Sequence, residues 1–162
     1  MTAVTRVIPS FHVEIHHDER LFSLDRKGAI RVKLPEAARV LVLDDDPKRL
    51  DWFRKSVREA TGHAPTCCTT VDELIGELEG GEFDVVFLDH DLCWLDAAYS
   101  ERKHGNGKEA ARYLAWMGFK GMVVVHSVNE DGAKAMNTYL PQARVAPFGT
   151  FELEFTVSPG SA

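Results

Sequence analysis

The stretch Val40-Leu41-Val42-Leu43-Asp44-Asp45-Asp46-Pro47 (VLVLDDDP, residues 40–47) decides the fold of this chain. Four consecutive apolar residues without alternation are typical of a strand that is buried on both faces of a parallel sheet. Asp46 before Pro47 predicts a helix start, because aspartate caps unpaired backbone N–H groups and proline fits the first helical position. The next residues predict one buried helix face that ends at Gly62, formed by Leu50, Phe53, Val57 and Ala60.

The same alternation of strand and helix recurs along the chain. Apolar runs at Val85–Leu88 and Met122–Val125 predict buried strands, and weaker strands are expected at Ala64–Thr69 and around Val145. Helices are predicted from a capping box at Thr70, over the stretch around Ala110–Met117, and from about Asn129 to Leu140. Five such repeats predict an α/β fold with a doubly wound, five-stranded parallel sheet.

The two ends of the chain follow a different rhythm. Alternating apolar and polar residues at 11–15 and 30–34 predict two half-buried strands, with a turn at 25–28 between them. Residues 151–157 alternate as well, and we expect this strand to pair with the N-terminal hairpin, which would set Glu152 and Glu154 near Arg31 and Lys33. The predicted organisation is a β extension at 1–38, an α/β domain at 39–148, and a C-terminal strand and tail at 149–162.

Composition limits the classes of protein to consider. The 162 residues are 44% apolar and 27% charged, which is typical of one globular domain. The net charge of −6 argues against a broad basic surface for duplex nucleic acid. The longest apolar runs are far shorter than the ~20 residues that cross a bilayer, so no membrane association is expected. Three cysteines without CxxC spacing argue against a disulfide scaffold and favour a cytoplasmic location.

Acidic and histidine side chains follow three of the predicted strands. Asp44 and Asp45 end the first, Asp89-His90-Asp91 the third, and His126-Ser127 the fourth. Because ligands bind beyond the carboxyl ends of strands in doubly wound sheets, we expect these residues to converge at one edge. Clustered carboxylates repel one another unless a cation neutralises them, and Mg²⁺ or Mn²⁺ suits such oxygen ligands; imidazole ligands would shift the preference toward Mn²⁺, Fe²⁺ or Zn²⁺.

Each of these residues also has an ordinary structural interpretation. Asp44 and Asp45 fit solvated acids near a helix start, and Asp89 fits a turn. Ser127 lies three residues before Glu130, as in a capping box. His90 and His126 fit ordinary hydrogen-bonded histidines. Asn129 fits a plain loop position, and His104 fits a solvated position in an irregular segment. The shared location of the acids and histidines after strand ends is what favours a site.

Residues 40–47 and the helix after them resemble the start of a response-regulator receiver domain. In that family paired acids after the first strand bind Mg²⁺, and an aspartate after the third strand accepts phosphate. Asp44, Asp45 and Asp89 match those positions. Ala146-Pro147-Phe148 stands where receivers carry Lys-Pro-Phe, so the lysine that binds the phosphoryl group is replaced by alanine.

Two further motifs resemble a narrower family. Leu88-Asp89-His90-Asp91-Leu92 and His126-Ser127-x-Asn129-x-x-Gly132-x-x-x-Met136 are similar to the signatures of the cyclic-phosphate-processing receiver-like family. The resemblance covers about residues 39–147, and Glu130 stands where proline is expected. It implies a receiver-like (flavodoxin-like) fold. It also implies a metal-dependent phosphoesterase that opens RNA 2′,3′-cyclic phosphate ends or cyclic nucleotides.

The resemblance also suggests a role for each candidate residue. Asp44, Asp45, Asp89 and Asp91 are expected to hold Mg²⁺ or Mn²⁺. Catalysis is assigned to Asp89, to His90 and to His126, with either histidine as the acid that protonates the leaving ribose oxygen and Asp89 as nucleophile in one variant. The expected substrate contacts are Ser127, Asn129, Lys103, His104 and Lys108. The alternative is a non-catalytic receiver-like module that binds a nucleotide, phosphate or protein partner. Both hypotheses leave the oligomeric state open.

Overall fold

The computed structural model of the protein describes residues 22–24, 30–92, 105–149 and 151–155. Its main sheet has five parallel strands in the order β4-β3-β5-β6-β7. The strands are β3 (Val40–Leu43), β4 (Thr66–Cys68), β5 (Val85–Leu88), β6 (Met122–Val125) and β7 (Arg144–Val145). The helices among the described residues are α1 (Pro47–Thr61), α2 (Val71–Gly80), α4 (Gly107–Met117) and α5 (Glu130–Tyr139). The predicted α/β fold with a five-stranded parallel sheet is confirmed.

Helix α1 begins and ends where the sequence predicts. The backbone N–H groups of Lys48 and Arg49 donate to Asp46 Oδ1, which satisfies two amides that have no partner inside the helix. Gly62 ends the helix with φ 80°, in the left-handed region that a residue with a side chain rarely adopts.

Helix α5 begins two residues later than a capping box at Ser127 would require. Its N-cap is Asn129, whose Oδ1 accepts a hydrogen bond from Gly132 N–H at 2.9 Å. Ser127 Oγ accepts from Asn129 N–H at 3.1 Å instead, so it shapes the turn that leads into the helix. Ser127 and Asn129 therefore both act on backbone amides at the start of α5.

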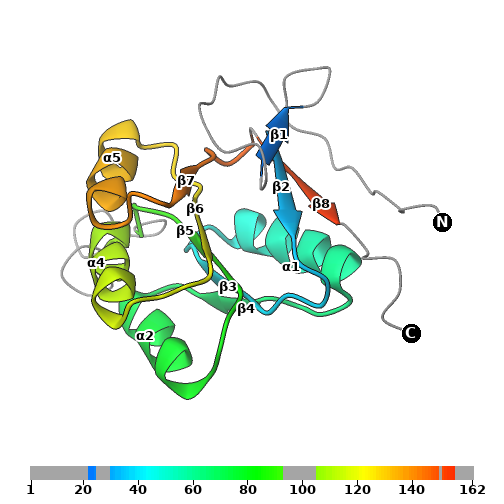
Figure 1. Cartoon of the computed structure of the whole chain (residues 1–162), viewed down its shortest axis with the longest axis horizontal. Coiled ribbons are helices and arrows are strands. Elements are labelled where there is room, and N and C mark those ends of the chain that lie inside the picture. The colour runs from blue at the N-terminus through cyan, green and yellow to red at the C-terminus, as the bar shows by residue number, and fades with distance from the viewer. Residues whose placement is uncertain (1–21, 25–29, 93–104, 150, 156–162) are drawn as a thin grey trace.

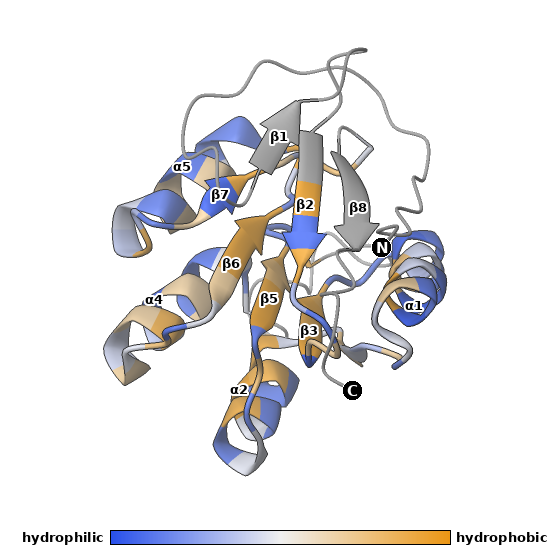
Figure 2. Cartoon of the chain, turned by 45° about the vertical axis from the view of Figure 1, so that its right-hand side comes forward, coloured by the Kyte–Doolittle hydropathy of each residue, from blue (hydrophilic) through white to orange (hydrophobic). Residues whose placement is uncertain are grey.

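The main sheet separates two apolar cores (Figure 1). Helices α2, α4 and α5 cover one face, where Leu114 and Met136 pack with Leu43 of β3. Helix α1 covers the other face, where Phe53 packs with Val42 of the same strand. Successive residues of β3 thus enter opposite cores, which explains why this strand is apolar throughout (Figure 2).

A smaller sheet lies on the α1 side of the molecule (Figure 1). Its strands are β1 (Phe22–Leu24), β2 (Ile30–Leu34) and β8 (Phe151–Phe155), with β1 antiparallel and β8 parallel to β2. The expected register is confirmed at the backbone, since Arg31 pairs with Glu152 and Lys33 with Glu154. The hairpin is formed by β1 and β2, while the alternating residues 11–15 lie outside the described part.

The small sheet covers the main domain through β2. Val32 and Leu34 are buried in the same core as Phe53. Their burial shows that this sheet covers the apolar core beside α1. None of the helices among the described residues is long and apolar enough to cross a membrane.

Leu34→Ala tests this packing. We expect the substitution to lower the free energy of unfolding by about 2–5 kcal/mol, because it leaves a cavity in a closed core. The matched control is Lys33→Ala, at a half-buried neighbouring position, which should cost much less. Urea unfolding of the two variants measures the difference, and equal losses would mean that β2 does not pack as described.

Candidate functional site

The candidate site lies at the carboxyl ends of β3, β5 and β6. Leu43, Leu88 and Val125 are register partners across these strands. The residue after each of them is therefore brought to the same edge: Asp44, Asp89 and His126. The predicted convergence thus follows from in-register parallel pairing.

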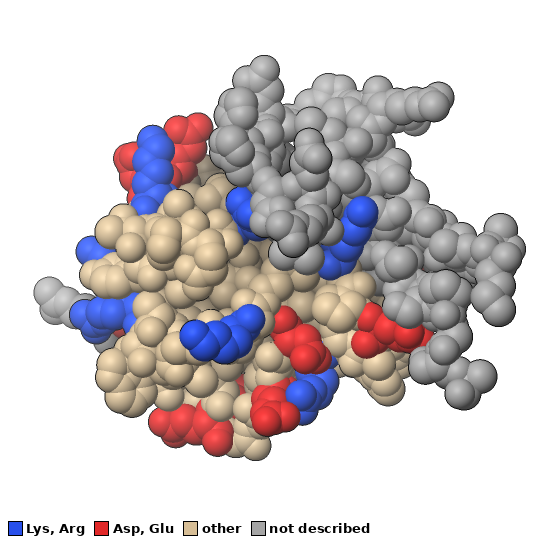
Figure 3. Space-filling view, in the orientation of Figure 1, with Lys and Arg blue, Asp and Glu red and all other residues tan. Residues whose placement is uncertain are grey.

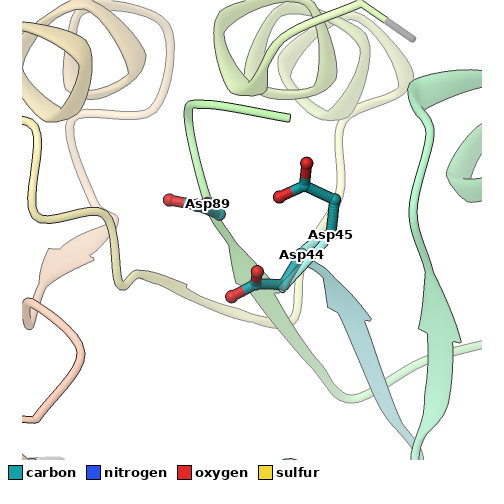
Figure 4. Close-up of side chains that lie close together, drawn as sticks. All are labelled: Asp44, Asp45 and Asp89. Carbon is teal, nitrogen blue, oxygen red and sulfur yellow. The ribbon is translucent and has the colours of Figure 1, made fainter. Parts of the chain in front are cut away.

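Three carboxylates meet at this edge (Figure 4). Asp44, Asp45 and Asp89 each offer an oxygen, and these atoms lie within 4.8 Å of one another. Asp44 and Asp89 are almost fully buried, and Asp45 is half-buried. Oxygen ligands at this spacing fit a hard divalent cation such as Mg²⁺ or Mn²⁺.

Asp44 is held by His126 and by the backbone of Asp46. His126 Nε2 lies 2.8 Å from Asp44 Oδ2, and the N–H of Asp46 donates to Asp44 Oδ1 at 2.9 Å. His126 is 0% exposed, and the rings of Phe53, Phe87 and Phe148 surround its imidazole. Its Nδ1 is buried with no hydrogen-bond partner in the part of the chain that the structure describes. The imidazole therefore acts on Asp44 and is shielded from solvent.

Arg49 is a site residue that the sequence patterns did not predict. Its Nη2 lies 3.1 Å from Asp44 Oδ1 and 3.0 Å from Asp89 Oδ2, so one nitrogen bridges two buried carboxylates. Its Nε is buried without a hydrogen bond to any described residue, a condition that costs about 1–3 kcal/mol for a polar group. One feature of the sequence could have indicated Arg49 as a site residue. It lies in the first turn of α1, where the helix dipole disfavours a cation.

Burial raises the pKa of Asp89 above its ordinary value. The electrostatic interaction with His126 lowers this pKa, the neighbouring Asp44 raises it, and Arg49 lowers it again. The N–H of His90, which donates to Asp89 Oδ1 at 2.9 Å, lowers it further. The net effect is upward, so the ionised form of Asp89 is strained in the absence of a metal ion.

His90, Asp91 and Asn129 form a second polar chain, a row of hydrogen-bonded side chains beside the three carboxylates. His90 Nδ1 lies 2.7 Å from Asp91 Oδ1, and Asn129 Nδ2 donates to Asp91 Oδ2 at 3.1 Å. Burial raises the pKa of Asp91, but the hydrogen bonds from His90 and Asn129 outweigh it and the pKa is lowered. Asp91, predicted as a metal ligand, lies outside the three-carboxylate group found in the described part. Its Oδ1 contacts the His90 imidazole, and its role as a metal ligand stays a prediction.

Two glycines allow this packing. A Cβ at Gly132 of α5 would lie 2.4 Å from His90 Cγ, so the imidazole rests directly against the helix backbone. A Cβ at Gly107 of α4 would lie 2.2 Å from the carbonyl oxygen of Asp89 and 2.6 Å from Met136 Sδ. Gly107, together with Gly132 and Met136 of the quoted motif, thus supports the strand end that carries Asp89 and His90.

The predicted substrate contacts are distributed around this edge. Ser127 is buried and bonded to the backbone of Asn129, and Asn129 caps α5. Lys108 is exposed in the first turn of α4, whose first residue, Gly107, donates its N–H to His90 O at 2.9 Å. Lys103 and His104 lie outside the described residues. Roles for these residues in substrate binding stay predictions.

Comparison with known proteins identifies one family. The family model described as cyclic-phosphate processing receiver domain matches residues 39–142, more than half of the chain. No curated protein matches the sequence.

Solved structures of response regulators share the fold. TrrA from Thermotoga maritima, in complex with Mg²⁺-BeF, has 17% identity and a TM-score of 0.52 over 68% of this chain and 88% of its own. The BeF₃-activated receiver domain of nitrogen regulatory protein C has 17% identity and a TM-score of 0.53 over 72% and 86%. A two-component response regulator from Clostridium difficile has 12% identity and a TM-score of 0.50 over 76% and 85%.

Asp89→Asn should stabilise the metal-free protein at neutral pH. The folded-state pKa of Asp89 lies above its unfolded value, so wild-type stability falls as pH rises through the raised pKa, and the neutral amide escapes this loss. The gain should disappear below the ordinary carboxyl pKa, where the wild-type residue is protonated in both states. Urea unfolding with a chelator present, at both pH values, measures it.

The control for this prediction is Asp51→Asn. Asp51 is 77% exposed on α1 and pairs with Arg54, so its amide variant should show no such gain. Added Mn²⁺ should stabilise the wild type more than Asp89→Asn. A metal-free Asp89→Asn protein that is less stable than wild type at neutral pH would contradict the assigned strain.

Proposed function

The chain belongs to the family of cyclic-phosphate processing receiver domains, and on that premise we propose that it is a metal-dependent phosphoesterase that opens cyclic phosphates. The proposed substrates are RNA ends with a 2′,3′-cyclic phosphate and cyclic nucleotides. One observation carries the proposal: a carboxylate cluster suited to a divalent ion adjoins a histidine that an aspartate orients. Hydrolysis of a phosphodiester needs both charge neutralisation and an acid for the leaving oxygen.

Asp44, Asp45 and Asp89 are the proposed ligands of the ion. Mg²⁺ or Mn²⁺ is favoured because the donors are carboxylate oxygens, and the Thermotoga response regulator was solved with Mg²⁺. When bound there, the ion would supply charge neutralisation at phosphorus and a water of lowered pKa. Because Asp44 and Asp89 are buried, their carboxylate oxygens are held in the cluster that would bind the ion.

His90 is the proposed acid for the leaving ribose oxygen. Asp91 Oδ1 accepts from Nδ1–H, which leaves Nε2 as the ring nitrogen that exchanges the proton. The lowered pKa of Asp91 keeps this carboxylate ionised, so its contact with Nδ1 is charge-assisted and fixes the ring orientation. His126 is assigned a positioning role, because its side chain is fully buried and its Nε2 is directed at Asp44.

The helix starts at this edge suit a small anionic substrate. The N-termini of α4 and α5 follow the strand ends, and backbone N–H groups at helix N-termini favour phosphate. Lys108, exposed in the first turn of α4, adds a positive charge. On the face drawn in Figure 3, basic and acidic side chains of the described residues are interspersed, which favours a compact phosphate ligand over a duplex.

A turnover panel tests the reaction. Purified protein with Mg²⁺, Mn²⁺ or Zn²⁺ would be offered RNA ending in a 2′,3′-cyclic phosphate, 3′,5′-cyclic mononucleotides and cyclic dinucleotides. We expect one class to be opened, activity to stop with a chelator, and Asp89→Asn to lower kcat/KM about 100-fold or more. Asp51→Asn should retain wild-type turnover. Metal-dependent binding of a nucleotide without opening any class would favour the non-catalytic module instead.

His90→Gln separates proton transfer from binding. Because glutamine keeps a polar side chain but cannot exchange a proton near neutral pH, we expect kcat to fall about 100-fold or more with KM little changed. The pH–rate profile should also lose its alkaline limb. His63→Gln, at an exposed position after α1, is the matched control. A variant whose kcat and pH profile match those of wild type would remove His90 from the mechanism.

A further inference from the structure

We propose that Arg49 is an internal cation that alternates with the divalent ion. In the metal-free protein it neutralises Asp44 and Asp89, and it releases both carboxylates when the ion binds. The released guanidinium then contacts the phosphate of the ligand, a last step that rests on the proposed function. The exchange between Arg49 and the ion rests only on the geometry of the three-carboxylate cluster.

The two cations would share the same oxygens. Asp44 Oδ2 is directed at His126, and Asp89 Oδ1 accepts from the N–H of His90. The other two oxygens, Asp44 Oδ1 and Asp89 Oδ2, are those that Arg49 Nη2 contacts at 3.1 and 3.0 Å. An ion coordinated by both carboxylates and Nη2 would compete for these lone pairs, so binding of one weakens binding of the other.

Arg49 is held in a way that permits its release. Among the described residues its Nε is buried without a hydrogen-bond acceptor, since Asp46 Oδ2, with which it forms an ion pair at 3.6 Å, is beyond hydrogen-bond distance. The residue lies in the first turn of α1, where the helix dipole opposes a positive charge. With 18% of its side chain exposed, the guanidinium has a route toward solvent. The short contacts to Asp44 and Asp89 are therefore the main interactions that retain it, beside the longer ion pair with Asp46.

The released guanidinium has a function that another residue has lost. Ala146 stands where receiver domains carry the lysine that binds the phosphoryl group, and its buried methyl group offers no charge. Arg49 Cζ lies 5.8 Å from the centroid of the Phe148 ring, two residues further along, so the aromatic face can keep the cation near the site. A guanidinium also matches two phosphate oxygens at once.

The charges of the site also fit this exchange. The three carboxylates total −3, and a divalent ion leaves −1. Arg49 retained nearby brings the sum to zero. A phosphate would therefore meet a neutral site with a guanidinium at hand, whereas without Arg49 it would meet a net negative charge.

Metal affinity provides the first test, and it does not depend on turnover. Mn²⁺ would be titrated calorimetrically into metal-free wild type, Arg49→Gln and Arg54→Gln. We expect Arg49→Gln to bind Mn²⁺ about tenfold more tightly than wild type, within the usual range of coupling between sites. Arg54→Gln removes the same charge from an exposed position on α1 and should match wild type. Equal or weaker Mn²⁺ binding by Arg49→Gln would overturn the proposal.

NMR can follow the displacement of Arg49 by the ion directly in the wild-type protein. In NMR spectra with ¹⁵N labelling, the Nε–H signal of Arg49, assigned by its loss in Arg49→Gln, should move as Mg²⁺ is added. A signal that stays in place while Mg²⁺ binds would show that the guanidinium remains between the carboxylates, and would overturn the exchange. If Arg49→Gln does not fold, assignment through the backbone resonances of wild type still gives this readout.

Inorganic phosphate tests the last step. With Mg²⁺ at saturation, wild type should bind phosphate about tenfold more tightly than Arg49→Gln, with Arg49→Lys between them because lysine keeps the charge but not the fork. Equal phosphate affinities would overturn this step alone. Tighter Mn²⁺ binding by Arg49→Gln in a protein that opens no cyclic phosphate would reject the proposed function and leave the metal exchange intact.

Discussion

Two carboxylates, Asp44 and Asp89, lie buried together at the ends of adjacent strands, and the site is organised around their repulsion. Parallel pairing of β3 with β5 brings them together, and one nitrogen of Arg49 contacts both. His126 contacts the other oxygen of Asp44, and the backbone N–H of His90 donates to the other oxygen of Asp89. Burial nevertheless raises the pKa of Asp89, so the metal-free arrangement costs stability that a divalent ion would restore.

The apolar core supports this charged edge from below. Phe53, Phe87 and Phe148 surround the His126 imidazole, and Phe53 shares its core with Leu34 of the small sheet. The small sheet therefore does more than extend the chain, because it closes the apolar layer on which His126 rests. A rigid imidazole in turn holds Asp44 in one orientation, as a supporting residue does for a metal ligand.

On the opposite face, helix starts and glycines place the second polar chain. Gly132 lets the His90 ring lie against α5, and Asn129 both caps α5 and binds Asp91. One short segment thus starts a helix, orients a carboxylate and supports an imidazole. Asn129 therefore has a structural role as the cap of α5 and also holds Asp91, the partner of His90.

The sequence by itself determined the alternation of strands and helices from β3 to β7, the cap at Asp46, the pairing of Arg31 with Glu152, and the strand ends that meet at the site. These features depend on local periodicity and on the geometry of parallel sheets. The sequence did not predict β1 as the partner of β2. The tertiary structure alone decided that Arg49 bridges two acids and that His126 is sealed behind Asp44. Arg49 and Asp89 are separated by 40 positions in the chain, and Asp44 and His126 by 82. Their partners are set by side-chain burial and direction, which no periodicity encodes.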